Sequence, residues 1–300
     1  MHEIELSAGP IAYEDTAGPG PVVVLLHGLA MDGSVWSQVV QQLRPAHRCV
    51  VPTMPLGSHR KPMRRDADLS ASGLAKLVAE LLQALDLRNV TLVGNDAGFF
   101  QITAGLYPER LARLVLTPCE SFENFPPGLP GRTAAMGVRM PGGAFLMAQT
   151  LRLRPLRRLP LTFGWMAKRP IPHHMLDTWL HPLQTCRGVR RDLTKFIRTS
   201  STEDMLAAAD RLRSFDRPAL VIWAPEDRVN PAAHGRRWAD LLPQGRLIEF
   251  GDSYTLMPLD QPDALARAIR HFIRDTPRRS DRQAATNKEQ AISSNRGSSR

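Results

Sequence analysis

The chain alternates short apolar runs with longer amphipathic stretches. Runs rich in valine, leucine and isoleucine have the continuous apolar character of strands buried on both faces of a parallel sheet, and they lie at 21–28, 48–54, 90–94, 111–118, 217–227 and 245–253. Between them apolar residues recur at the three- and four-residue spacing of helices, at 34–43, 71–87, 99–111, 231–242 and 262–274. Strands that alternate with helices predict an α/β fold with a doubly wound, mostly parallel sheet.

The alternation breaks in the middle of the chain. Residues 121–213 are rich in proline and arginine and have helical patterns without strands, so we expect an inserted helical cap there. The core would then have a first part at 1–120 and a second part at 214–275. Residues 276–300 lack apolar periodicity and aromatic side chains, and we expect them to form a disordered basic tail.

Positive charge is concentrated in the cap. The net charge of the chain is +10, and residues 126–200 hold 13 basic and 2 acidic side chains. Such a segment could attract an anionic substrate, a membrane surface or nucleic acid. Nucleic-acid binding is not expected, because aromatic interleaving and recognised modules are absent. The stretch 151–161, LRLRPLRRLPL, could lie on a membrane, but Pro155 interrupts a long amphipathic helix and a solvated helix face is the expected interpretation.

Several classes of protein are not expected. The N-terminus has charges and no apolar signal-peptide region, and no apolar run is long enough to span a bilayer, so we predict a cytoplasmic protein without a transmembrane segment. Cys49, Cys119 and Cys186 are widely spaced and form no CxxC pair, so neither disulfides nor a zinc site is predicted. Because no metal cluster or dinucleotide fingerprint is present, we expect no metal and no cofactor.

One turn carries candidate chemistry. The stretch 90–100, VTLVGNDAGFF, predicts a buried strand, a sharp turn and the start of a helix, with Asp96 at the apex. We expect Gly94 and Gly98 to permit the tight turn, so that the apex side chain is exposed at the carboxyl end of the sheet, under the cap. An aspartate is also favoured at a helix N-terminus. By itself the pattern is more typical of a helix N-cap than of a catalytic residue. The choice between these two roles therefore depends on other residues of the chain.

Further residues follow in the order that a catalytic site at this sheet edge needs. His27 and Gly28 end a buried strand, Asp227 follows a strand beyond the cap, and the stretch 250–272 links the last strand to the last helix. With the segments VGNDAG and LARLVLTPCESFENFPP, the chain resembles the α/β-hydrolase fold over about residues 11–273. Within that fold it is similar to the branch with an aspartate nucleophile, the haloalkane dehalogenases and epoxide hydrolases.

The resemblance implies roles for these residues. Asp96 would attack a saturated carbon that carries a halogen or belongs to an epoxide, forming an alkyl ester that water later cleaves. The backbone N–H groups of Leu29 and Ala97 would form the oxyanion hole. Asp227 would orient a histidine that activates the water, and His27, Gly28, Gly94 and Gly98 would be structural neighbours of the site.

The expected histidine is absent. Its position, counted back from Gln261, falls at Thr255 or the adjacent Tyr254. Tyrosine is a poor base at neutral pH and threonine is no base. His59, in the loop after the second central strand, is the strongest alternative base, although a surface or capping role is the more typical one. Histidines 173, 174 and 181 of the cap are weaker alternatives.

The groups that hold the leaving atom also differ. Dehalogenases bind the halide with a tryptophan after the nucleophile, where this chain has Ala97, and with a second donor where it has Leu29. Epoxide hydrolases use cap tyrosines, but no tyrosine lies in the cap segment. Trp165 and Trp179 could line an apolar pocket, although packing of the cap on the sheet is more typical.

We therefore expect a hydrolase that acts on a small, largely apolar substrate through Asp96. The alternatives are a catalytically degenerate relative that binds a ligand or partner, and a non-hydrolytic enzyme that uses Asp96 as a base with a raised pKa. The sequence leaves the oligomeric state open.

Overall fold

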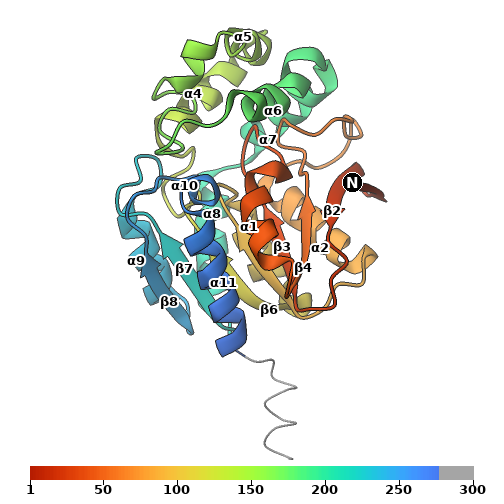
Figure 1. The fold of residues 1–300 in the computed structure, drawn as a ribbon. Helices are drawn as coiled ribbons and strands as arrows, with labels where there is room; N and C mark the ends of the chain where they lie inside the picture. The colour runs from red at the N-terminus through yellow and green to blue at the C-terminus, as the bar shows by residue number, and fades with distance from the viewer. Residues whose placement is uncertain (277–300) are drawn as a thin grey trace, which may run out of the picture.

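The computed structural model describes residues 1–276, and the predicted tail lies outside this range apart from Thr276. One sheet has the strand order β1-β2-β4-β3-β5-β6-β7-β8, in which β1 and β2 are antiparallel and the other strands parallel (Figure 1). The strands are β1 His2–Leu6, β2 Gly9–Asp15, β3 Val22–Leu26, β4 Arg48–Pro52, β5 Val90–Gly94, β6 Leu111–Leu116, β7 Ala219–Trp223 and β8 Gly245–Glu249. The predicted mostly parallel α/β sheet is confirmed.

The central strands are parallel because they are buried on both faces. Every residue of β5 and β7 is buried, as is all of β3 after Val22. The sequence analysis did not anticipate the hairpin of β1 and β2. Its charged and half-exposed residues suit an edge, where one face of an antiparallel strand stays in water.

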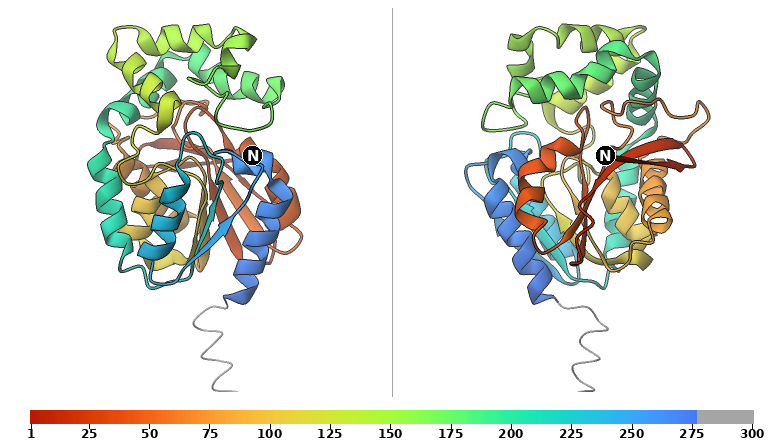
Figure 2. Two further views of the ribbon diagram at one scale, coloured as in Figure 1. Left: turned by 90° about the vertical axis from the view of Figure 1, so that its left-hand side faces the viewer. Right: turned by 45° about the vertical axis from the view of Figure 1, so that its right-hand side comes forward.

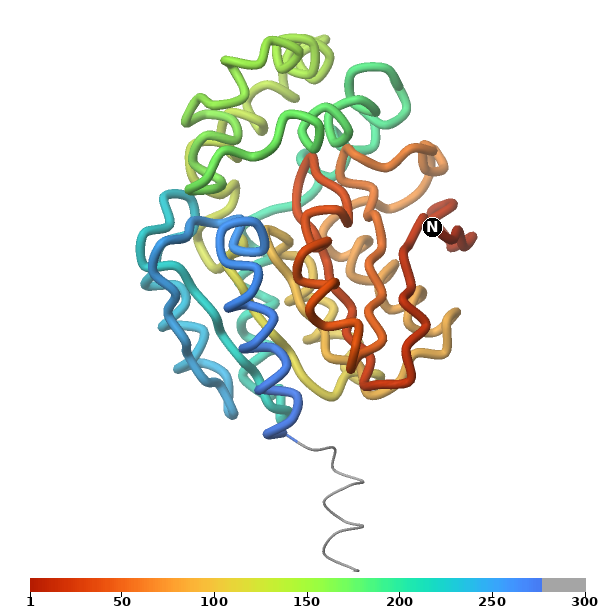
Figure 3. The backbone as a smooth tube through the Cα atoms, viewed as in Figure 1, coloured from red at the N-terminus to blue at the C-terminus, as the bar shows by residue number. Residues whose placement is uncertain are grey.

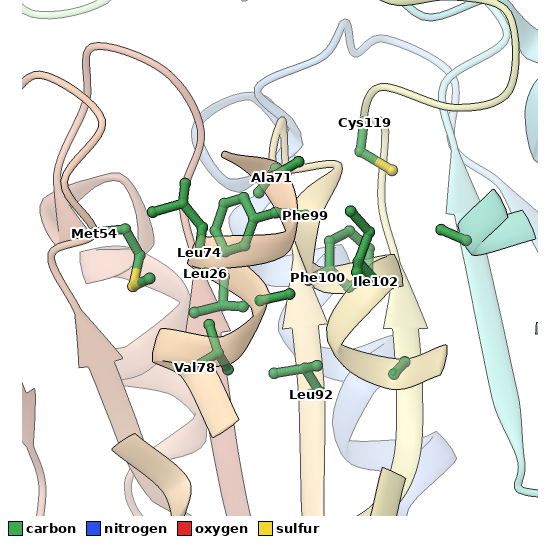
Figure 4. Packing of buried hydrophobic residues seen from close by; sticks show 14 of the residues in the cluster. Leu26, Met54, Ala71, Leu74, Val78, Leu92, Phe99, Phe100, Ile102 and Cys119 are labelled. Atoms are coloured by element: carbon green, nitrogen blue, oxygen red, sulfur yellow. The ribbon is translucent and has the colours of Figure 1, made fainter. Parts of the chain in front are cut away.

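Helices cover both faces of the sheet. On one face α2 and α3 pack over the central strands, and Figure 4 shows Leu74, Val78 and Phe99 in one buried cluster with Leu26 and Leu92. On the other face α1 and α11 pack side by side, with Trp36 fully buried beneath them. These core helices are α1 Ser37–Leu43, α2 Ala71–Ala84, α3 Phe99–Leu106, α8 Thr202–Leu212, α9 Ala232–Leu241, α10 Met257–Asp260 and α11 Pro262–Asp275, with short 3₁₀ turns η1 Gly33–Trp36 and η2 Pro108–Arg110.

A separate group of helices forms a lid at one end of the molecule (Figures 2 and 3). Its members are α4 Gly128–Arg139, α5 Gly143–Thr150, η3 Arg154–Arg158, α6 His173–Thr185 and α7 Arg187–Thr199. The next helix, α8, packs against α3 beside the sheet. Helical periodicity in the sequence shows that a segment forms a helix but does not show which surface it covers. We therefore propose that the cap comprises residues 128–199 and that α8 belongs to the core.

Two buried contacts fasten the cap to the core. The Asp192 carboxylate in α7 accepts hydrogen bonds from the Met63 backbone N–H (2.8 Å) and the His59 ring (3.1 Å). The Ser58 hydroxyl donates to the Trp179 carbonyl (2.8 Å). Within residues 1–276 no helix is both long and apolar enough to cross a membrane.

Candidate active site

Strand register brings three loops together at the edge of the sheet under the cap. Leu26 of β3 pairs with Gly94 of β5, and Gly94 in turn pairs with Leu116 of β6. The chain therefore leaves three neighbouring strands at the same level. The loops that follow carry Leu29, Asp96 and Glu120, which all line one cavity.

The turn at Asp96 is a sharp left-handed elbow. Asp96 has φ +51°, a conformation that is uncommon for any residue other than glycine and is held only when its surroundings fix it. The backbone N–H of Asp96 donates to the Pro118 carbonyl (2.8 Å), and that of Asn95 donates to the Leu26 carbonyl (3.1 Å). The elbow is thus anchored to both neighbouring strands.

The flanking glycines serve the elbow through space, not through backbone freedom. The positive φ of the turn belongs to Asp96 itself, and neither Gly94 nor Gly98 has a positive φ. A Cβ on Gly94 would overlap the Phe100 ring, and one on Gly98 would lie 2.7 Å from the Met205 Sδ. The missing side chains therefore let α3 pack closely against Gly94 and let α8 pack closely against Gly98.

Gly28 and Leu29 lie directly against Asp96. A Cβ on Gly28 would overlap the backbone oxygen and the carboxyl group of Asp96. The Leu29 backbone N–H donates to the Asp96 carboxyl group and favours its ionised form. This N–H is therefore placed where it could stabilise an oxyanion formed on that carboxyl group. His27 is fully buried, and its ring bonds only to backbone groups: Nε2 accepts from Met54 N–H (2.9 Å) and Nδ1 contacts the Gly28 oxygen (2.9 Å).

Glu120 is a candidate that the sequence analysis missed. It is buried, lines the same cavity as Asp96 and accepts a hydrogen bond at Oε2 from the Gly98 backbone N–H (2.7 Å). A signal was available, because Glu120 is an acidic residue that follows directly after the run 111–118, at the carboxyl end of a central strand. Burial raises the pKa of this carboxyl group.

Asp227 and Thr255 form a closed pair. The Thr255 hydroxyl lies 2.8 Å from Oδ1 and 2.9 Å from Oδ2 of Asp227. Oδ1 also accepts the backbone N–H groups of Val229 (2.8 Å) and Asn230 (3.0 Å). Burial raises the pKa of Asp227 to about 6. Thr255, the position where the resemblance implies a histidine, thus lies beside Asp227, and neither member of the pair lines the cavity.

The other candidate residues lie apart from Asp96. Tyr254 is 5.1 Å from the Arg228 guanidinium, and its backbone N–H bonds to Asp260. His59, named from the sequence as a possible alternative base, does not line the cavity. Its Nε2 contacts Asp192, and its Nδ1 accepts from the Gly57 N–H (3.3 Å). Both ring nitrogens are therefore bonded, Nε2 to the cap and Nδ1 within its own core loop.

The carboxyl groups around Asp96 act on one another. Burial raises the pKa of Asp96 well above its ordinary value, and the neighbouring charges of Glu120 and Asp227 raise it further. Within residues 1–276 no lysine, arginine or histidine lines the cavity to offset them. The described residues also contain no group of three metal-binding side chains. The site is therefore a cluster of acidic groups in which a proton is held readily.

The cavity has a volume of about 200 Å³ and is almost entirely apolar. Its polar lining consists of Asp96 and Glu120 at the sheet and the threonines 133, 150 and 162 on the cap. Neither Trp165 nor Trp179 contributes, and Trp179 instead donates to Asp32 (3.0 Å) and Ser34 (2.8 Å). The positive charge of the cap does not reach the cavity wall, so it gives no support to an anionic substrate.

A family model described as the alpha/beta hydrolase family matches residues 23–268. The chain belongs to the alpha/beta hydrolase family. It is 31% identical over 274 residues to a pimeloyl-[acyl-carrier protein] methyl ester esterase of Aeromonas salmonicida, covering 85% of this chain and 96% of the relative. It is 24% identical over 288 residues to a haloalkane dehalogenase of Mesorhizobium japonicum, covering 90% of each.

Solved structures agree with this assignment of the fold. The haloalkane dehalogenase DbeA from Bradyrhizobium elkani superposes with a TM-score of 0.75 at 18% identity, covering 92% of this alpha/beta hydrolase and 97% of the dehalogenase. At that identity the match shows the fold alone. The resemblance to haloalkane dehalogenases stated from the sequence is confirmed.

Proposed function

We propose that this alpha/beta hydrolase acts on a small, largely apolar molecule, with Asp96 as the nucleophile. One observation carries the proposal: the Asp96 side chain is held on a strained elbow at the floor of a largely apolar cavity. Such strain persists at functional positions because the surrounding structure fixes it. A structural N-cap would need neither the elbow nor the cavity.

The first chemical step uses groups that line the cavity. The ionised Asp96 carboxylate attacks a saturated carbon, forms a C–O ester bond and displaces the leaving group with its electron pair. For an epoxide, that group is an oxygen that must gain a proton. Glu120 has its Oε2 bound to Gly98, so a proton on Oε1 could be transferred to such an oxygen. An epoxide or related oxygen leaving group therefore suits this cavity better than a halide, for which no side-chain N–H donor among the described residues lines the wall.

The second step has no evident base. Hydrolysis of the ester needs a group that takes a proton from water, and Thr255 stands where the family has its histidine. The closed Asp227–Thr255 pair favours a second candidate function, a family member that binds an apolar ligand without turning it over. The two functions differ in whether Asp96 forms a covalent bond.

Intact-protein mass spectrometry tests the proposal. The full chain is incubated with panels of epoxides and alkyl halides that carry apolar groups, with Asp96→Asn as control, and products are assayed in parallel. We expect a persistent adduct, mapped by peptide analysis to Asp96 and absent from the control. Because the pKa of Asp96 is raised, adduct formation with alkyl halides, which needs no proton from Glu120, should become faster as the pH increases and the carboxylate forms.

The other outcomes separate the alternatives. Product formation without an adduct, lost in Asp96→Asn, keeps the nucleophile and means that a base exists elsewhere. Equal product formation in both proteins contradicts the proposal. If neither adduct nor product forms, while the same compounds raise the melting temperature of both proteins, ligand binding is the better function.

A further inference from the structure

Exposed apolar side chains concentrate on one part of the cap. Of the twelve large apolar residues that are exposed within residues 1–276, eight lie between positions 129 and 161. They are Leu129, Met136, Met140, Phe145, Leu146, Leu153, Leu159 and Leu161. We call this surface, formed by α4, α5 and residues 151–161, the cap crest. Large contiguous apolar patches on a protein surface mark interaction sites.

Helix α5 explains why the crest is apolar. The sequence of α5 is GAFLMAQT, with no polar residue before Gln149. Ala144 and Met147 line the cavity, whereas Phe145 and Leu146 face outward with exposed fractions of 51% and 61%. A helix that is apolar on all sides is normally buried. Half of α5 therefore lacks a covering within the described structure.

The charges around this surface are mostly positive, and Asp177 of α6 pairs with one crest arginine, Arg154 (3.8 Å). Residues 124–176 contain no aspartate or glutamate. The crest carries exposed arginines at positions 132, 139, 152, 154 and 158. A further arginine, Arg190 of α7, lies 5.1 Å from the Phe145 ring. Long basic side chains can lay their stems along apolar surface and keep their charge at a polar boundary.

We propose that the cap crest docks on a membrane surface that contains anionic lipids. Leucine, methionine and phenylalanine side chains would enter the boundary between headgroups and acyl chains, and the surrounding arginines would contact the lipid phosphates. The crest is suited to this by its position, because α4 and α5 lie at the end of the molecule opposite the end of α11 (Figure 1). No other element would obstruct a flat surface there.

The positive charge of the crest favours an anionic membrane over a second copy of the chain. A second copy of the chain would bring two arginine-rich surfaces together, and like charges in contact disfavour association. Nucleic acid is disfavoured because Phe145 is the one exposed aromatic side chain on the described crest, which gives few surfaces for stacking bases. A lipid bilayer offers both the acyl region and the negative charge that this surface lacks.

The crest also adjoins the cavity. Leu161 is exposed at the surface and also lines the cavity. Met147 and Leu151, which are half-buried, line the cavity as well. An apolar molecule dissolved in the bilayer could therefore reach the cavity without crossing water. That route rests on the proposed function, whereas docking itself does not depend on Asp96.

Vesicle flotation tests the docking. The full chain is mixed with vesicles of phosphatidylcholine alone or with phosphatidylglycerol added, at low and at physiological salt. We expect binding to the anionic vesicles, weakened by salt because screening reduces attraction between exposed charges. Binding to the neutral vesicles should be much weaker. Equal recovery with both lipids, or none with either, contradicts the proposal.

Paired variants assign the binding to the crest. Phe145→Ser with Leu146→Ser should reduce partitioning at least about tenfold, because two apolar side chains no longer enter the bilayer. Arg152→Glu with Arg158→Glu should reduce it by at least about tenfold, given about fivefold for each basic residue near an anionic surface. Both variants keep residues 277–300, so any contribution of those residues to binding is the same in all proteins.

Matched controls exclude a general effect of the substitutions. Leu106→Ser with Leu206→Ser removes two exposed leucines from α3 and α8, and Arg246→Glu with Arg267→Glu reverses two exposed charges on β8 and α11. These controls should bind as the unchanged chain does. If they lose binding as the crest variants do, the crest is not the docking surface.

A second measurement reports insertion directly. In Phe145→Trp the new indole should be quenched by vesicles with brominated acyl chains, beyond the quenching of the unchanged chain. Absence of extra quenching would show that the crest does not enter the bilayer. Binding of the anionic vesicles by an unquenched crest would point to an acidic partner surface in place of lipid insertion, and it would overturn the proposal.

Discussion

The surroundings of Asp96 and of Asp227 differ although both carboxyl groups follow buried strands of one sheet. Asp96 lines the cavity, with the Leu29 N–H and Glu120 beside it. Asp227 does not line the cavity, and both of its oxygens contact the Thr255 hydroxyl. One carboxyl group faces the space where a substrate would lie, while the other faces its own partner.

The two carboxyl groups therefore depend on different side-chain contacts, although the Asn95 side-chain amide of the elbow donates to the Thr255 carbonyl (2.7 Å) and links their loops. The elbow depends on backbone contacts between neighbouring strands and on the absence of side chains at Gly28, Gly94 and Gly98. The Asp227–Thr255 pair instead joins side chains from the loops after β7 and β8. Under the proposed function, a substitution at Thr255 would change proton transfer without adding a side chain at the three glycines around Asp96.

Thr255→His should have the largest effect of the substitutions considered. A histidine at this position could donate one ring N–H to Asp227 and accept a proton from water on the other nitrogen. We expect hydrolysis of an Asp96 ester to become about 10²- to 10⁴-fold faster, the usual contribution of a general base. The measurement is the decay of the adduct followed by mass spectrometry.

Thr255→Gln is the matched control, because glutamine is similar in size to histidine and has no basic nitrogen. Its adduct should decay at the rate of the unchanged chain. Thr255 is fully buried, so the melting temperatures of both variants must also be recorded. If the Thr255→His protein folds but its adduct decays no faster, the absence of a histidine at this position is not what limits hydrolysis of the ester.

Gly28→Ala should disrupt the nucleophile half. The added Cβ would overlap Asp96 on a central loop where the backbone cannot move freely, and we expect a loss of at least about 3 kcal/mol in the free energy of unfolding, at the upper end for overpacked sites. Gly251→Ala is the matched control, because a Cβ there meets nothing within 4 Å. Urea denaturation measures both, and equal midpoints would mean that the elbow tolerates displacement.

The fold was largely predictable because buried parallel strands have a strong local pattern. The runs 21–28, 90–94 and 111–118 contain β3, β5 and β6. The hairpin of β1 and β2 was not predicted, because its residues alternate weakly and carry charges. The place of α8 could not be read from its periodicity, since amphipathic helices of the cap and of the core follow the same spacing.

The site was predictable only where one short segment contains the chemistry. The elbow at Asp96 follows from VGNDAG, because strand, turn and helix are adjacent in the sequence. The Asp227–Thr255 pair joins residues from two separate loops, and its hydrogen bonds depend on how those loops fold back. Glu120 could have been considered from its position after a strand. Its closeness to Asp96 comes from the register of β5 and β6, which the sequence does not reveal.

Asp227→Asn tests whether the Asp227 carboxyl group makes the stability of the protein depend on pH. The pKa of Asp227 rises from an ordinary 3.8 to about 6, so its protonated form is favoured in the folded state. Its contribution to stability is complete below pH 3.8 and is lost as the pH rises through about 6. The loss amounts to at most about 3 kcal/mol, because solvent reaches part of the residue.

The measurement is the free energy of unfolding between pH 4 and 7, shown by urea titrations of both proteins. Asparagine can keep an acceptor for the Val229 and Asn230 N–H groups, so the variant should fold. Its stability should fall less than that of the unchanged chain over this window. Parallel curves for the two proteins would show that Asp227 does not carry the pH dependence.

His59→Gln has the smallest expected effect and separates cap attachment from catalysis. Glutamine can still donate a hydrogen bond to Asp192, and Asp192 still accepts the hydrogen bond from the Met63 N–H. We therefore expect the free energy of unfolding to fall by about 1 kcal/mol. The rate of adduct formation and its dependence on pH should not change, because both ring nitrogens of His59 are already bonded outside the cavity. Loss of a general base would lower the rate more than about tenfold and shift its pH profile. That result would mean that His59 takes part in catalysis.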